Sequence, residues 1–191
     1  AALVSNADRL EAVRALSLVN AGKTVRRVNY RDVDVQELSS VYESLLDLQP
    51  VLDATAMPPV FDLVTGIERK TSGSYYTPPD LVQAPIRSAL DPVIAQKLEG
   101  ASTSEEKLTG LLSLTVCDPA CGSGHFLLAA ARRIGKEVAR LRSGDSEPDP
   151  VQVREGVREA VRHCIYGVDL DPLAVDLCKL ALWLAAHTPG K

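Results

Sequence analysis

Residues 111–134 read LLSLTVCDPACGSGHFLLAAARRI, and the interpretation of the remaining sequence starts from this segment. Its apolar run from Leu111 to Cys117 is typical of a buried parallel strand. A turn containing Gly122 and Gly124 follows, and apolar positions then recur at helical spacing as far as Leu141. The segment therefore predicts a strand, a glycine-containing loop and a helix.

A second strand and helix follow towards the carboxyl end of the sequence. Residues 164–168 are apolar and precede Asp169, and Asp171-Pro172 then opens a helix whose apolar coverage implies burial on most sides. A short amphipathic helix is expected over 153–161. Because crossovers between parallel strands are right-handed, the two strands should pair, with the glycine loop and Asp169 at their carboxyl edge. This arrangement predicts an α/β fold.

The first 70 residues are predicted to form a helical N-terminal segment. Apolar residues recur at helical spacing over 8–20 and 36–49. Two short apolar pieces within 51–64 favour a pair of short strands. A further helix is expected to begin at Thr77-Pro78, with a kink at Pro85, whose ring removes a backbone donor.

The composition indicates which class of protein the chain belongs to and which partners it can bind. The chain has 191 residues, of which 46% are hydrophobic and 24% charged, as in globular domains. Its longest apolar run, 180–186, is too short to cross a bilayer, and the first residues show no signal-peptide pattern, so we expect a cytoplasmic protein without a membrane partner. The net charge of −4 means that any contact with DNA must come from a local patch or another part of the protein.

Two other sets of side chains are given structural interpretations. The four cysteines are expected to be reduced thiols, and their spacing does not favour a metal site. The helix after the glycine loop carries a basic side, which we expect to be a solvated face rather than a DNA contact. Its members are Arg132, Arg133, Lys136, Arg140 and Arg142.

The glycine loop and Asp169 have chemistry that suits a nucleoside ligand. Gly122 and Gly124 let a ligand approach the backbone and offer N–H groups to an anion. Asp169 can accept both hydroxyls of a ribose. The third glycine of a dinucleotide-binding fingerprint is replaced by Leu127. The alternatives are a structural tight turn and an ordinary loop carboxylate, and Asp171 is expected to cap a helix.

Three motifs resemble those of adenine-N6 DNA methyltransferases that use S-adenosylmethionine. Residues 118–127, DPACGSGHFL, resemble motif I, and residues 167–174, GVDLDPLA, resemble motif II. Residues 73–78, GSYYTP, resemble motif X and precede motif I, which is the gamma order. The resemblance covers about 71–186 and is greatest for large single-chain restriction-modification and phage-defence methylases. It implies a partial Rossmann-like methyltransferase domain over 71–191, with parallel strands and flanking helices.

The same resemblance implies which residues bind S-adenosylmethionine. This cofactor has a carboxylate, an ammonium, a sulfonium and a ribose but no pyrophosphate, so the third glycine is not required. The methionine carboxylate would contact Thr77, the ammonium would face Asp118, and the ribose hydroxyls would bind Asp169. The remaining expected cofactor-binding residues are Ala120, Gly122 and Gly124 along the methionine moiety and Tyr76, which would pack on the cofactor.

The catalytic motif of this family is not found in the sequence. That motif is Asn, Asp or Ser followed by Pro-Pro and an aromatic residue, whereas the Pro-Pro pairs at 58–59 and 78–79 lack both flanking residues. Motif order places it beyond motif II. We therefore expect no catalytic residue here, a chain truncated before that motif and inactive alone, and self-association through an incomplete sheet and uncovered helix faces. DNA would be the partner of the full-length protein.

The sequence leaves open two alternatives to a DNA methyltransferase. RNA and protein-glutamine methyltransferases share Asp-x-x-x-Gly-x-Gly loops, although they do not usually carry the upstream Tyr-Thr-Pro element. A non-catalytic interaction module would retain only the fold. The intact Gly122, Gly124 and Asp169 argue against a decayed site of that kind.

Overall fold

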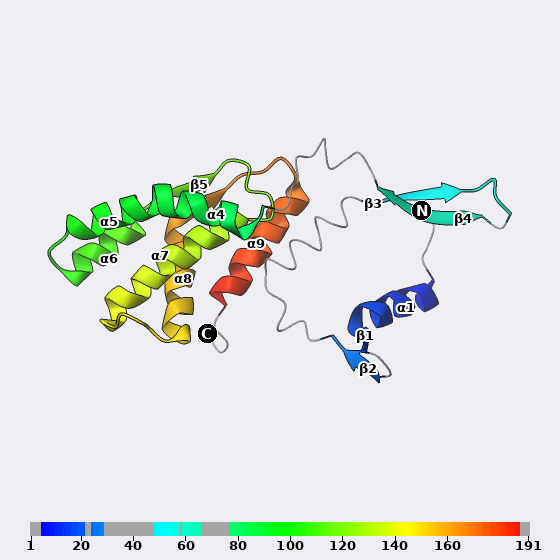
Figure 1. Ribbon diagram of the computed structural model, residues 1–191, viewed down its shortest axis with the longest axis horizontal. Coiled ribbons are helices and arrows are strands. Elements are labelled where there is room, and N and C mark those ends of the chain that lie inside the picture. The colour runs from blue at the N-terminus through cyan, green and yellow to red at the C-terminus, as the bar shows by residue number, and fades with distance from the viewer. Residues whose placement is uncertain (1–4, 22–23, 29–47, 58, 66–76, 188–191) are drawn as a thin grey trace. The chain divides into compact units, whose positions relative to one another are not determined.

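The computed structural model describes residues 5–21, 24–28, 48–57, 59–65 and 77–187 (Figure 1). The chain divides into two compact units, Ala1–Asp34 and Val35–Lys191. It is a mixed α/β protein, mostly helical, with three two-stranded sheets among the described residues. The predicted domain boundary at residue 70 lies outside the described residues and stays a prediction.

The described residues of the first unit form one helix and one pair of strands. Helix α1 (Asn6–Ser17) is capped by Ser5, whose side chain accepts a hydrogen bond from the Asp8 N–H. Strands β1 (Leu18–Ala21) and β2 (Thr24–Arg27) pair in antiparallel register. The predicted helix over 8–20 is therefore wrong for residues 18–20, because the hairpin supplies partners for their backbone groups.

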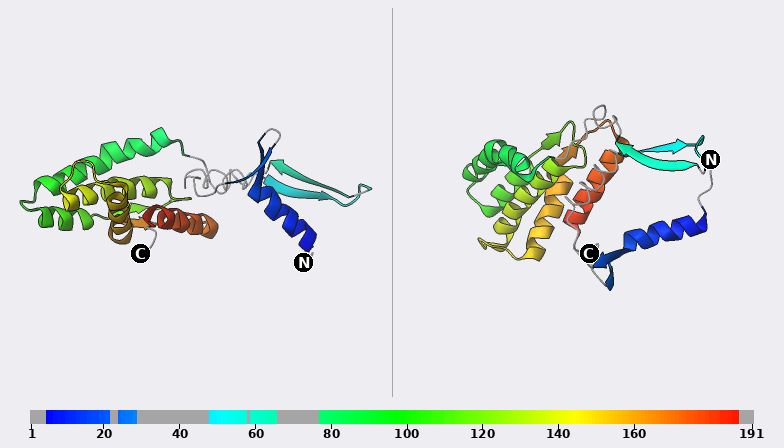
Figure 2. Two further views of the ribbon diagram at one scale, coloured as in Figure 1. Left: turned by 90° about the horizontal axis from the view of Figure 1, so that it is seen from below. Right: turned by 45° about the vertical axis from the view of Figure 1, so that its right-hand side comes forward.

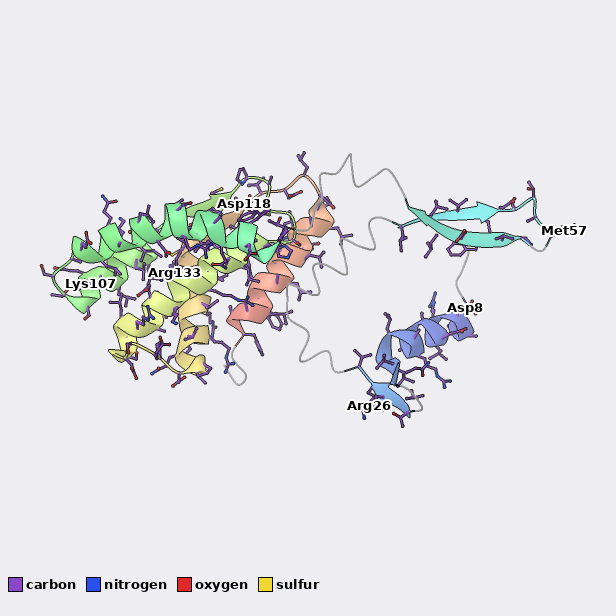
Figure 3. All side chains as sticks on the ribbon, in the orientation of Figure 1. Asp8, Arg26, Met57, Lys107, Asp118 and Arg133 are labelled. Atoms are coloured by element: carbon purple, nitrogen blue, oxygen red, sulfur yellow. The ribbon has the colours of Figure 1, made fainter. Side chains whose placement is uncertain are left out.

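A second hairpin consists of β3 (Leu48–Asp53) and β4 (Val60–Thr65), which are antiparallel and connected by a turn that carries Met57 (Figure 3). Asp53 shapes the turn by accepting hydrogen bonds from the Thr55 backbone and hydroxyl at 2.9 and 2.6 Å. The strand pair predicted within 51–64 is confirmed. The helix predicted over 36–49 is wrong for residues 48–49, which begin β3, and its remaining part lies outside the described residues.

The C-terminal part, residues 77–187, begins with three consecutive helical elements. They are α4 (Pro79–Pro85), the π-helical turn η1 (Ile86–Leu90) and α5 (Asp91–Glu99). Pro85 cannot donate a backbone hydrogen bond, and the helix continues through it by widening into η1. The predicted start is wrong by one residue, because Pro78 is the N-cap and Pro79 the first helical residue.

Helix α6 (Ser104–Leu112) occupies part of the segment that the sequence predicted as a strand. It starts with a capping box in which Thr103 and Glu106 exchange side-chain-to-backbone hydrogen bonds. Leu111 is fully buried as a helical residue. The strand β5 is therefore limited to Val116–Asp118.

Three longer helices lie side by side in the C-terminal part (Figures 1 and 2). They are α7 (His125–Ser143), α8 (Pro150–Cys164), which contains the predicted helix over 153–161, and α9 (Pro172–Ala186). Asp171 caps α9 as predicted, accepting a hydrogen bond from the Leu173 N–H at 2.9 Å. The prediction that α9 is buried on most sides is wrong for the described residues, because Leu173, Leu180, Trp183 and Leu184 are exposed.

The α7–α8 seam is an unusually close helix contact. A Cβ atom added to Gly156 would lie 2.2 Å from the Gly135 carbonyl oxygen, and one added to Gly135 would lie 2.5 Å from the Val157 nitrogen. The two backbones therefore meet directly. Ile134 and Val138 of α7 join Ala160 of α8 in the main hydrophobic core beside this seam.

The predicted pairing of the two strands is confirmed. Strand β5 pairs in parallel with β6 (Ile165–Gly167), with Val116 opposite Ile165 and Cys117 opposite Tyr166. Val116 and Ile165 contact the helical core, whereas Cys117 and Tyr166 are exposed on the other face. The described helices thus cover one face of this short sheet. None of the helices in the described ranges is long and apolar enough to span a membrane.

Candidate cofactor site

The loop between β5 and α7 is held in place by short-range hydrogen bonds. The side chain of Asp118, which ends β5 (Figure 3), accepts a hydrogen bond from the Ala120 N–H at 3.1 Å. The Gly124 N–H then donates to the Cys121 carbonyl at 2.8 Å. These contacts turn the chain sharply between the end of the strand and the start of α7.

The loop is also fastened to the segment that follows β6. The Cys121 N–H donates to the Val168 carbonyl, and the Val168 N–H donates to the Asp118 carbonyl, both at 2.9 Å. The strand pairing is thereby extended past the last residues of β5 and β6. The loop has a defined position relative to Asp169, the next residue along the chain.

Asp169 and the glycine loop meet directly, as the sequence predicted. The Gly122 N–H donates to Asp169 Oδ2 at 2.8 Å, and the Asp171 N–H donates to Oδ1 at 2.9 Å. The anion held by the Gly122 N–H is therefore a carboxylate of the chain itself. Each carboxylate oxygen accepts one of these hydrogen bonds and keeps one lone-pair direction, so Asp169 has capacity for two further donors.

The two glycines of the loop have different surroundings. Both adopt left-handed backbone conformations, with φ of 52° at Gly122 and 93° at Gly124. A Cβ atom on Gly124 would lie 2.6 Å from Cys178 Sγ, whereas one on Gly122 would meet nothing within 4 Å. Gly124 is thus required by packing, while Gly122 borders open space. That space is where a bound molecule can reach the loop.

The underside of the loop is a small hydrophobic core. Cys121, Leu127 and Cys178 are buried together. Burial disfavours the thiolate and raises the pKa of Cys178 to about 12, and it also raises the pKa of Cys121. Both side chains therefore act as small apolar groups, and Cys164 is buried as well. No group of three or more potential metal-ligating side chains occurs within the described ranges.

Leu127 shows why a third glycine is absent from the loop. It is almost completely buried, and a Cβ atom on Gly167 would lie 2.7 Å from Leu127 Cδ1. Gly167 in β6 therefore makes room for Leu127. Sequence reasoning overlooked this role of Gly167, although a glycine immediately before the Val-Asp pair of the second motif was a visible signal.

Thr77 lies at the start of the helical element that packs on α7. It is half-buried and precedes α4, whose Val82 is buried against Ala129 and Ala130 of α7. The structure thus puts Thr77 in the same compact part as the loop, while Tyr76 lies outside the described residues. Ala120 is exposed on the loop surface.

A hollow of about 530 Å³ borders the loop. Asp118 and Pro119 line it at the end of β5, together with Phe126 of α7 and Ile86 and Leu90 of η1. The lining is mostly apolar, and Asp118 contributes the carboxylate. The loop is therefore bordered by open space at Gly122 and by a partly enclosed hollow at Asp118.

Two further features of the site were not found from the sequence. Ser123 and His125 are buried polar residues at the start of α7, with Ser123 Oγ 3.2 Å from His125 Nδ1. Leu170 is fully exposed immediately after Asp169. Both features depend on burial in the folded chain, which the local residue pattern does not reveal.

Residues 96–190 match the family model described as the DNA-methyltransferase domain of MmeI. This match covers 95 of the 191 residues of the chain. The segment contains the loop, Asp169 and helices α6 to α9. Together with the two named relatives described next, this match confirms the resemblance to adenine methyltransferases of restriction-modification systems.

The chain has relatives in an archaeon and a bacterium. A protein of Methanocaldococcus jannaschii named "Putative type II restriction enzyme and methyltransferase" is 25% identical over 171 residues, covering 73% of this chain and 14% of the relative. The adenine-specific methyltransferase PglX of Streptomyces coelicolor is 40% identical over 77 residues, covering 40% of this chain and 6% of the relative. The chain thus spans a small part of the relatives it matches. No solved structure matches it.

Proposed function

We propose that residues 77–187 form the S-adenosylmethionine-binding part of an adenine-N6 DNA methyltransferase from a restriction-modification or phage-defence system, acting in the cytoplasm. The observation that carries this proposal is the hydrogen bond between the Gly122 N–H and Asp169 Oδ2 at 2.8 Å. This hydrogen bond connects the loop that follows β5 to the acid that follows β6. Both parallel strands lie in the segment that matches the MmeI methyltransferase family.

The residues of the site suit the polar groups of S-adenosylmethionine. Asp169 keeps a free acceptor direction on each oxygen, which matches the two ribose hydroxyls. Asp118 uses Oδ1 to hold the loop and would direct its other oxygen to the ammonium. The open space at Gly122 would admit the methionine moiety along Ala120 and Gly124.

Three other residues would complete this binding arrangement. The methionine carboxylate would be bound by Thr77, and Tyr76 would pack on the cofactor. Leu170, exposed beside Asp169, offers an apolar surface to the adenine ring. The bound cofactor would supply an electrophilic methyl group, and the described residues would orient it for a target adenine. The proposed domain is Rossmann-like, with β5 and β6 as two of its strands.

Calorimetry with S-adenosylmethionine tests the proposal on the purified chain. Asp169→Ala removes the proposed ribose acceptor, so we expect affinity to fall at least tenfold. Asp176→Ala is the matched control, because Asp176 is an exposed acid on α9 that pairs only with Lys179 among the described residues. It should bind like the parent chain. Circular dichroism would verify that both variants are folded. Failure of the parent chain to bind millimolar S-adenosylmethionine would contradict the proposal.

The substrate class is tested with the full-length protein and a radiolabelled methyl donor. Label in DNA, recovered as N6-methyladenine, is expected. Label in RNA or in protein glutamine would instead support another methyltransferase class, and the absence of any transfer despite cofactor binding would support a non-catalytic module.

We also propose that the chain self-associates. The outer face of the β5–β6 sheet exposes Cys117 and Tyr166, and α9 exposes Leu180 and Leu184. A second copy would cover part of this apolar surface. Light scattering should give a mass above that of one 20.5 kDa chain, and a monomeric mass would refute this proposal.

A further inference from the structure

A hollow of about 580 Å³ between α8 and α9 combines positive charge with aromatic surface. Arg158 and Arg162 of α8 and Lys179 of α9 supply the cations. Trp183 and His187 supply aromatic rings, and Leu182 contributes to the apolar floor. The hollow therefore offers cations from both helices together with a flat aromatic surface.

The two arginines of this hollow differ from the cations on α7. Arg133 is paired with Asp91 and Glu137, and Arg142 is paired with Glu159. In contrast, neither Arg158 nor Arg162 forms an ion pair with any residue in the described part of the chain. Because Arg158 and Arg162 are four residues apart, they lie on the same face of α8 and can bind one anion together.

Lys179 adds a third cation that is easily available. Its only described ion pair is with Asp176 at 3.0 Å, and both side chains are about 70% exposed. Such an exposed pair is weak and exchanges readily for another anion. The positive charge of the hollow is thus less neutralised than that of α7.

The aromatic side of the hollow is formed by two rings in contact, of which the indole is accessible. The ring centroids of Trp183 and His187 are 4.8 Å apart, with 32° between the ring planes. Trp183 is nevertheless 58% exposed. An exposed indole next to guanidinium groups that have no ion pair among the described residues suits a ligand that joins a phosphate to a planar base.

The hollow is separate from the candidate cofactor site. Helix α9 begins at Pro172, close after Asp169, and Trp183 lies 11 residues further along it. At a rise of about 1.5 Å per residue, this distance is roughly 16 Å along the helix. A ligand in the hollow would therefore not occupy the space around Gly122 and Asp169.

We propose that the α8–α9 hollow binds a nucleotide unit of a single-stranded nucleic acid. Arg158 and Arg162 bind the phosphodiester, Lys179 binds the neighbouring phosphate, and Trp183 stacks on the base. The chain has a net charge of −4, so its overall field does not attract nucleic acid and binding depends on this local site. The inference does not rest on the proposed cofactor site, because it involves other residues and needs no cofactor.

Fluorescence polarisation with a labelled 12-nucleotide DNA strand, without cofactor, tests the arginines. The double variant Arg158→Ala, Arg162→Ala should bind at least tenfold more weakly at about 0.1 M salt. Its plot of log affinity against log salt should be flatter by about 0.7, because the contact with one phosphate is lost. Arg154→Ala, an exposed arginine of α8 outside the hollow, is the charge-matched control and should change affinity by less than about twofold. Equal losses in the control and the double variant would overturn the site.

Substitutions of Trp183 test the stacking contact. Trp183→Ala should weaken binding at least fivefold without changing the salt dependence, whereas Trp183→Phe should retain most of the affinity. A duplex should bind more weakly than the single strand, because its bases are already stacked. Tighter duplex binding, or displacement of the DNA by an equal concentration of polyglutamate, would overturn the proposal.

Two cross-checks keep this inference distinct from the cofactor proposal. Asp169→Ala should retain binding of the DNA strand, and the double arginine variant should retain binding of S-adenosylmethionine if the parent chain binds it. Circular dichroism would confirm that each variant is folded. Loss of DNA binding in folded Asp169→Ala would show that the hollow is not the nucleic-acid site.

Discussion

The α7–α8 seam and the candidate cofactor loop both depend on glycine, but for different reasons. In the seam, an added Cβ on Gly135 or Gly156 would overlap the backbone of the neighbouring helix. In the loop, Gly122 has open space around the position of its missing Cβ, and only its left-handed backbone favours glycine. In the seam, the space beside each glycine is filled by the neighbouring helix, whereas the space beside Gly122 is not filled by the described residues. Gly144, the C-cap of α7, has the same open space, so the sign of a ligand at Gly122 is the combination of that space with the neighbouring Asp169 carboxylate.

The seam should give the largest stability effect. Gly156→Ala places a methyl group against the Gly135 carbonyl, so the helices must separate, and we expect a loss of about 3 kcal/mol or more in the free energy of unfolding. Gly110→Ala in α6 is the matched control, because its Cβ would meet only Lys97 of α5, at ordinary contact distances of 3.8 and 3.9 Å. That variant should gain about 0.5–1 kcal/mol through helix propensity. Urea denaturation measures both, and equal effects would contradict the description of the seam.

Substitutions of two glycines with positive φ should distinguish an effect on stability from an effect on ligand affinity. Gly122→Ala and Gly144→Ala both place alanine at a positive φ without a steric contact, so each should cost about 1 kcal/mol of stability. Only Gly122→Ala should weaken S-adenosylmethionine binding, by about tenfold, because its methyl group would point into the proposed ligand space. Urea denaturation and calorimetry provide the two readings. Unchanged affinity in Gly122→Ala would mean that the space beside the loop is not used by the ligand.

The meeting of the loop with Asp169 was predictable because it follows from local patterns and one general rule. Each strand ends in a recognisable motif, and parallel pairing brings both carboxyl ends to the same edge. The detailed contact was not predictable in the same way. That Asp169 would accept the Gly122 N–H, rather than leave it for a ligand anion, depends on the positions of residues 47 apart in the sequence.

Other features were missed because competing local signals were stronger than the pattern that was used. Leu111 is apolar in either a strand or a helix, and the capping box formed by Thr103 and Glu106 decides for α6. The segment 18–20 continues a helical spacing, but antiparallel pairing with β2 makes it a strand. The α7–α8 seam has no sequence signal of its own, since a glycine inside a helix does not indicate which backbone approaches it.

The underside of the loop should make stability depend on pH. Burial raises the pKa of Cys178 to about 12, whereas an unfolded thiol titrates near 8.5. Below pH 8 both states keep the proton, and the contribution of this thiol to stability is complete. As pH rises towards the folded pKa, the unfolded chain loses the proton first and stability falls. From pH 8 to 9.5, Cys178 alone should account for a loss of about 1 kcal/mol.

Comparison with Cys178→Ala isolates this contribution from other groups that titrate in alkali. The variant should lose less stability than the parent chain over the same pH interval, as measured by urea denaturation at each pH. Cys164, whose pKa is raised to about 11 by burial, remains in both proteins and cancels in the difference. Parallel pH profiles would show that the Cys178 thiol is not shielded beneath the loop.

The smallest effect is expected from the ion pair that crosses the seam. Both terminal nitrogens of Arg142 on α7 contact the carboxylate of Glu159 on α8, and the side chains are 47% and 25% exposed. Solvent screening limits such a pair, so a double-mutant cycle with Arg142→Ala and Glu159→Ala should give a coupling free energy of about 0.5 kcal/mol. The coupling should decrease further in 1 M salt. A coupling above about 2 kcal/mol would mean that charge, rather than the direct contact of the Gly135 and Gly156 backbones, holds the two helices together.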